Sequence, residues 1–160
     1  SDEAGVAHLT DAACRTFAQE IANYCEAYDL DGVFFDDEYT YSWNHPGLTS
    51  PSTDRAARLC FETKMAMPDK MVTCYIYSRT YGFYKKIEGM EPGDFVDYAI
   101  SDYGSWDYED CYLGMERNQV APCSANFASS YARWTATQNN LQRDRAGTFS
   151  KTPARLLSTL

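Results

Sequence analysis

Ten residues, Leu30 to Tyr39, constrain the fold of this 160-residue chain more than any other segment. Their sequence is LDGVFFDDEY, in which a short apolar run is followed by three consecutive acids and an aromatic residue. A short apolar run of this kind is typical of a buried β-strand and is too short for a helix. The segment therefore predicts a buried strand that ends in acidic side chains.

The two faces of this strand divide its acids. Because successive side chains of a strand point to opposite faces, Asp36 and Glu38 share one face and Asp37 lies on the other. Residues two apart on a strand lie roughly 6.5 Å apart at Cα, so we expect the pKa of one of the paired carboxyls to rise. A carboxyl that stays protonated near neutral pH is suited to general acid catalysis.

Two other interpretations of the acidic run are a solvated exit from the strand and a calcium-binding loop. Acidic runs often form solvated surface, but this one directly follows a strand, where α/β folds place their active sites. A calcium loop of the EF-hand type would begin at Ala27, whose methyl group has no oxygen to bind the ion. The sequence favours a catalytic site, with the solvated exit as the simpler alternative.

The segment from Asp31 to Tyr39 resembles the D-G-x-D-x-D-x-E signature of family 18 glycoside hydrolases, and most closely its endo-β-N-acetylglucosaminidase branch. The spacing, the glycine, both functional acids and the trailing tyrosine agree. Phe34 departs from the signature, because the family has an aspartate there that supports the next one. The resemblance implies a (β/α)8 TIM barrel and no cofactor.

The resemblance also implies a retaining, substrate-assisted hydrolysis of β-1,4 bonds between N-acetylglucosamine residues, most closely in N-glycans. Glu38 would be the general acid, and Asp36 would orient the substrate's own N-acetyl group as it attacks the anomeric carbon. The run Tyr103-Gly104-Ser105-Trp106 resembles a Y-G-[ST]-W segment of the family, by which Tyr103 would hold that N-acetyl group. A chitinase and a catalytically weak glycan-binding relative are alternatives on the same scaffold.

Aromatic residues supply further candidates for substrate binding. The chain has 13 Tyr and 3 Trp, and flat aromatic rings suit stacking against sugars. Taken singly, each tyrosine is better explained as a half-buried packing residue and Gln119 as an ordinary polar strand residue, and Trp106 is equally explained as a packing anchor of its loop. The candidates are Tyr39, Tyr77, Trp106, Gln119 and Trp134.

Helical and strand patterns alternate along the chain. A helix is expected from about Asp11 to Tyr28, capped by Thr10 or Asp11. A second helix is expected to be capped by Thr53 or Asp54 and to be closed by Pro68. Apolar stripes at helical spacing support both: Cys14, Phe17, Ile21 and Cys25 in the first, and Ala57, Cys60, Phe61 and Met65 in the second.

Further strands are expected at 71–77, within 95–103 and at 119–124, with a strand or a helix at 133–138 and a closing helix at 151–160. This alternation predicts an α/β protein with a parallel sheet. A complete TIM barrel has about 250 residues, so residues 1–160 are expected to form one domain that is an incomplete C-terminal part of the barrel, from about strand 4 to strand 8.

Cysteine and histidine patterns give no support for a metal site. His8 and His45 lie far apart, neither pairs with a cysteine at ligand spacing, and the six cysteines form no C-x-x-C motif. Free thiols are therefore favoured over a disulfide framework.

Charge and hydropathy limit the classes of molecule that this chain is expected to bind. A net charge of −9 disfavours nucleic acid and anionic membranes, but it is compatible with a neutral, N-acetylglucosamine-containing glycan. No apolar run approaches the roughly 20 residues of a membrane span. The family resemblance implies a secreted or cell-surface protein, and the oligomeric state has no sequence signal.

Overall fold

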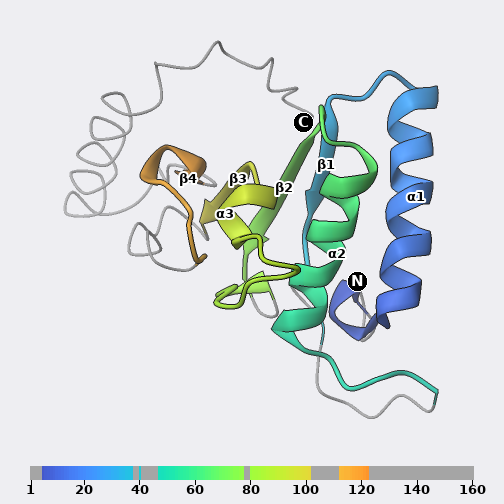
Figure 1. Ribbon diagram of the computed structural model, residues 1–160, viewed down its shortest axis with the longest axis horizontal. Coiled ribbons are helices and arrows are strands. Elements are labelled where there is room, and N and C mark those ends of the chain that lie inside the picture. The colour runs from blue at the N-terminus through green and yellow to red at the C-terminus, as the bar shows by residue number, and fades with distance from the viewer. Residues whose placement is uncertain (1–4, 38–39, 41–46, 78–79, 102–111, 123–160) are drawn as a thin grey trace, which may run out of the picture.

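The computed structural model describes residues 5–37, 40, 47–77, 80–101 and 112–122. Within them, four parallel strands form one sheet in the order β1-β2-β3-β4 (Figure 1). The strands are β1 (Gly32–Phe35), β2 (Met71–Ile76), β3 (Tyr98–Ser101) and β4 (Val120–Pro122). The helices are α1 (Asp11–Ala27), α2 (Thr53–Ala66) and the short α3 (Pro92–Phe95), with 3₁₀ turns η1 (Val6–His8) and η4 (Arg117–Gln119). The expected α/β class is confirmed.

The two faces of the sheet differ in burial. The register aligns Phe35, Cys74 and Ala99 across three strands, and these residues are buried in one core with residues of α1 and α2. Figure 1 shows both helices on one side of the sheet. On the opposite face, Phe34 of β1 is 48% exposed. Gly32 lets β1 start close to β2, because a Cβ there would overlap the backbone of Met71.

A hydroxyl side chain caps the N-terminus of each of the two long helices. The Thr10 hydroxyl accepts a hydrogen bond from the backbone N–H of Ala13 at 3.2 Å and caps α1, as expected. For α2 the expected cap was wrong by one residue, because the cap is Ser52 rather than Thr53 or Asp54. Ser52 has extended backbone and its hydroxyl accepts from the N–H of Arg55 at 3.3 Å, which places Thr53 inside the helix.

The buried stripe of α1 consists of smaller residues than expected, and one expected core residue of α2 is exposed. Phe17 in α1 is 39% exposed and Met65 in α2 is 45% exposed, so these two were wrongly assigned to the core. The buried positions of α1 are Cys14, Ala18, Ala22 and Cys25. Small side chains at these positions allow α1 to pack closely on α2.

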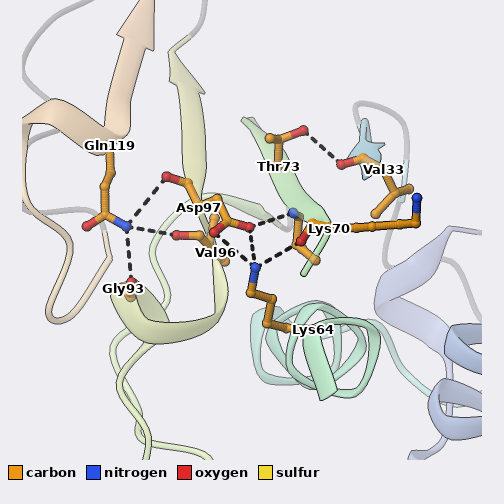
Figure 2. Close-up of polar contacts among 9 residues, drawn as sticks. Val33, Lys64, Lys70, Thr73, Gly93, Val96, Asp97 and Gln119 are labelled. Atoms are coloured by element: carbon orange, nitrogen blue, oxygen red, sulfur yellow. Dashed lines mark hydrogen bonds and ion pairs between the residues drawn. The ribbon is translucent and has the colours of Figure 1, made fainter. Parts of the chain in front are cut away.

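Polar side chains tie together the amino ends of the strands (Figure 2). Lys64 of α2 pairs with Asp97 at 2.9 Å, and Asp97 accepts a hydrogen bond from the N–H of Val72 at 2.7 Å. The amide nitrogen of Gln119 donates to the carbonyls of Gly93 and Val96 at 3.0 and 3.1 Å. We call Lys64, Asp97 and Gln119 the amino-edge cluster; it joins α2, β2 and the segments that lead into β3 and β4.

Two further expectations concern cysteines and segments near the C-terminus. The four described cysteines, Cys14, Cys25, Cys60 and Cys74, are buried and are not bonded to one another in this structure. Cys111, Cys123, the expected element at 133–138 and the helix at 151–160 lie outside the described residues. In the part of the chain that the structure describes, no helix is long and apolar enough to cross a membrane.

Candidate active site

The carboxyl ends of β1 and β2 lie at the same edge of the sheet, because the two strands are parallel. Asp36 directly follows β1, and Tyr77 directly follows β2. The register pairs Phe35 with Cys74, so Asp36 is level with Tyr75 and shares a sheet face with Tyr75 and Tyr77. The structure therefore brings two of the predicted site residues, Asp36 and Tyr77, to one edge and one face.

The neighbouring acids Asp36 and Asp37 have opposite surroundings, as strand alternation predicts. Asp36 is exposed on the open face, whereas Asp37 is 1% exposed on the helix side. The carboxylate of Asp37 accepts hydrogen bonds from the N–H of Ala7 at 3.4 Å and from the hydroxyl of Thr40. Asp37 thus links the turn η1 to the segment after β1.

Gly5 explains how η1 comes so close to this carboxylate. A Cβ at Gly5 would overlap both the Asp37 carboxylate and the Thr40 hydroxyl. The backbone can approach only because glycine has no side chain. The segment after β1 is therefore anchored on the helix side through Asp37, while Asp36 is exposed on the other face.

Three aromatic rings line the open face beside Asp36. The rings of Phe34 and Tyr75 have centroids 6.5 Å apart with an interplanar angle of 53°, and those of Tyr75 and Tyr77 stack at 5.9 Å and 16°. Tyr75 is 5% exposed and Tyr77 is 41% exposed. The stack leaves the outermost ring, Tyr77, accessible at the carboxyl edge, which is the arrangement needed for a sugar-stacking surface.

Thr80 holds the chain in place directly after β2. It is 0% exposed, and its hydroxyl lies within hydrogen-bonding distance of the carbonyls of Tyr75 and Tyr77, the latter at 2.7 Å. Its carbonyl accepts a hydrogen bond from the Tyr112 hydroxyl at 2.5 Å, and the Tyr112 ring stacks on Phe83 at 4.3 Å. A single buried threonine therefore fixes the backbone that carries Tyr77.

Gln119 does not reach this site. It precedes β4, at the amino edge of the sheet (Figure 2). Asp36 and Tyr77, in contrast, follow their strands at the carboxyl edge. Its amide donates to three backbone carbonyls, and its amide oxygen accepts from the N–H of Glu116 at 2.8 Å. The structure thus gives Gln119 a bracing role that uses both ends of its amide group.

Comparison with known proteins connects this chain to an enzyme class. No family model matches the chain. Endo-β-N-acetylglucosaminidase F1 of Elizabethkingia meningoseptica is 44% identical over 150 residues, which cover 91% of this chain. This chain is a relative of the endo-β-N-acetylglucosaminidases. The resemblance expected from the acidic segment is confirmed, although the matched region spans only 44% of that relative.

Solved structures agree with this relationship. EndoBT-3987 of Bacteroides thetaiotamicron, in complex with a Man5GlcNAc product, is 41% identical with a TM-score of 0.62, and the match covers 74% of this chain and 27% of that one. Its complex with a Man9GlcNAc2Asn substrate gives 39% identity and a TM-score of 0.63, covering 74% and 30%. A probable chitinase of Penicillium expansum is 34% identical over 95 residues, 58% of this chain and 6% of that protein.

The other predicted site residues of this endo-β-N-acetylglucosaminidase relative lie outside the described residues. They are Glu38, Tyr39, Tyr103, Trp106 and Trp134. Within the described residues, no three His, Cys, Asp or Glu side chains come together as a metal site.

Sequence reasoning missed two residues that shape the site. Tyr75 lies two residues before Tyr77, but this spacing does not by itself indicate that the two rings stack into one surface. Thr80 gave no signal, because its role depends on the path of the backbone after β2.

Proposed function

We propose that the protein containing this chain is an endo-β-N-acetylglucosaminidase that cleaves between the two core N-acetylglucosamine residues of N-glycans. The observation that carries the proposal is the acidic run Asp36-Asp37-Glu38, which directly follows β1 in the sequence, in a chain 44% identical to such an enzyme over 150 residues. The product and substrate complexes of EndoBT-3987 support the choice of N-glycans.

The proposed scaffold is a (β/α)8 barrel, of which this chain forms the part from about the fourth to the eighth strand. Four parallel strands with helices on one face support this. The open face, with Phe34 and Tyr77 exposed, would face the barrel interior. On the same resemblance we propose that the protein is secreted or attached to the cell surface.

In the proposed mechanism Glu38 protonates the glycosidic oxygen, and Asp36 orients the substrate's acetamido group for attack on the anomeric carbon. Tyr103 holds the acetamido oxygen, and Glu38 then deprotonates the attacking water, which gives retention. Two residues before Asp36, the strand has the aromatic ring of Phe34 instead of a carboxylate. Phe34 therefore cannot share a proton with Asp36.

A thiazoline analogue of N-acetylglucosamine tests this mechanism, because it resembles the cyclised intermediate. We expect it to inhibit the full-length enzyme, and Tyr103→Phe to weaken that inhibition by about 0.5–1.5 kcal/mol, the usual net value of one hydrogen bond. Asp36→Asn should weaken it more, since the lost hydrogen bond is charge-assisted. A covalent sugar adduct mapped to Asp36 by mass spectrometry would replace this scheme with the two-carboxylate mechanism.

Product analysis tests the function itself. The full-length protein is incubated with a glycoprotein that bears N-glycans and, separately, with chitin oligomers. We expect release of glycans that retain one N-acetylglucosamine, and a loss of roughly 10²–10⁴-fold in rate for Glu38→Gln with glycan binding retained. Wild-type turnover by this variant would contradict the role of Glu38.

A chitinase is the second candidate, favoured by the similarity to the probable chitinase of Penicillium expansum. In the same experiment, cleavage of chitin oligomers without release of N-glycans would establish this alternative. The two functions share the chemistry of Asp36 and Glu38 and differ in what binds beyond the cleaved bond.

A further inference from the structure

Two buried thiols face each other across the contact between α2 and β2. The Sγ atoms of Cys60 and Cys74 lie 3.3 Å apart, and the residues are 1% and 0% exposed. A disulfide bond is about 2.05 Å long, so the two sulfur atoms need to approach by only roughly 1.3 Å. Both side chains belong to regular elements, which hold the sulfur atoms at this separation.

The other described cysteines have different surroundings. The thiol of Cys14 points to the carbonyl of Arg55 at 3.8 Å, and that of Cys25 to the carbonyl of Gly32 at 3.7 Å. Among the described residues, only Cys60 and Cys74 form a thiol–thiol contact. Cys14 and Cys25 are therefore matched internal controls, because they are also buried cysteines of the same core.

We propose that Cys60 and Cys74 form a disulfide when the protein folds in the presence of a low-molecular-weight disulfide such as oxidised glutathione. One cysteine thiolate attacks the glutathione disulfide, which gives a mixed disulfide and one glutathione thiol. The second cysteine then attacks the protein sulfur of that mixed disulfide and releases a second glutathione. The two cysteines lose two electrons and two protons, and these reduce one glutathione disulfide to two thiols.

The surroundings of Cys60 determine when this reaction occurs. Burial raises the pKa of the Cys60 thiol well above its ordinary value, and the contact with Cys74 acts in the same direction. Since the thiolate is the attacking species, the folded protein should react slowly. Oxidation is therefore expected while the chain folds, before α2 closes over β2, and it does not depend on the proposed glycosidase function.

Oxidative refolding with peptide mapping tests the proposal. The full-length protein is reduced, unfolded and refolded either in a glutathione redox buffer or in reductant alone. Remaining thiols are then alkylated in denaturant and the protein is digested with trypsin without reduction. We expect residues 59–64 and 71–79 as one disulfide-linked species in the first sample, with Cys14 and Cys25 alkylated. Alkylation of both Cys60 and Cys74 in natively refolded protein would overturn the proposal, as would a bridge from either one to Cys14.

Thermal unfolding gives a second readout. A bridge from α2 to β2 restricts the unfolded chain, so the glutathione-refolded wild type should melt roughly 5 °C higher than the reduced protein. In Cys74→Ala, or in Cys60→Ala if the first variant does not fold, the two refolding conditions should give the same Tm. An equal rise in these variants would assign the stabilisation to another bridge and contradict the proposal.

Discussion

Asp36 and Asp37 are adjacent in the chain and carry the same chemical group, but the sheet gives them different roles. Asp36 is exposed on the open face, at the edge where a substrate would bind. Asp37 is buried and accepts hydrogen bonds from Ala7 and Thr40. Alternation along β1 predicts this division, but only the structure names the partners of Asp37, because η1 is distant in the sequence.

A matched pair of variants should separate these two roles. Asp37→Ala leaves a buried N–H and a buried hydroxyl without their acceptor, so the free energy of unfolding should fall by about 1–3 kcal/mol. Asp36→Asn should change it by less than about 0.5 kcal/mol, as is usual for exposed positions, while abolishing most activity. Urea unfolding and a glycan-release assay on the full-length protein measure both quantities.

The opposite pattern would contradict the assignment. If Asp37→Ala unfolds at the wild-type urea concentration, its carboxylate does not hold η1 against β1. If Asp36→Asn keeps wild-type activity, this acid has no role in the proposed reaction.

At the scale of elements, Thr80 fixes the segment after β2 that carries Tyr77. Thr80→Val keeps the shape of the side chain and removes the hydroxyl, so we expect a loss of about 1–3 kcal/mol in stability. Displacement of the Tyr77 ring should also lower kcat/KM for the glycan by roughly tenfold, because substrate contacts depend on sub-ångström placement. Unfolding and steady-state kinetics of the full-length protein test both expectations.

Two further variants distinguish positioning from general destabilisation. Thr80→Ser retains the hydroxyl and should restore the kinetics. Thr63→Val is the matched control, because Thr63 is 0% exposed and its hydroxyl has no hydrogen-bond partner among the described residues. Equal kinetic loss in Thr63→Val and Thr80→Val would show that any change in the core has this effect, and would refute the positioning role.

The elements themselves were largely predictable, and their details were not. Apolar stripes at helical spacing predicted α1 and α2, and short apolar runs predicted the positions of the strands along the chain. Phe17 and Met65 were misplaced because periodicity locates a helix face but not the closeness of the neighbouring element. Gln119 was assigned to a site from its residue type, whereas its role follows from three carbonyls that only the fold brings together. Ser52 was overlooked in favour of neighbours with equally good capping groups.

At the scale of the molecule, one face of the described sheet carries exposed aromatic residues. Phe34 and Tyr77 are 48% and 41% exposed, and β1 and β4 are the two outer strands of the described sheet. Outer strands and exposed aromatic side chains favour association over a stable monomer. We therefore expect residues 1–160 expressed alone to aggregate or to unfold without a sharp transition. Size-exclusion chromatography and thermal denaturation measure this, and a cooperative melt of a monomer would mean that the barrel proposal is wrong.

The separation between the amino-edge cluster and the acidic edge has an evolutionary consequence. Lys64, Asp97 and Gln119 brace the sheet at one edge, while Asp36 and the Tyr77 segment lie at the other. Substitutions and insertions around the acids can therefore accumulate without weakening the contacts of the amino-edge cluster. Homologues that have diverged in glycan preference should differ most around Tyr77 and still carry the lysine, aspartate and glutamine of the opposite edge.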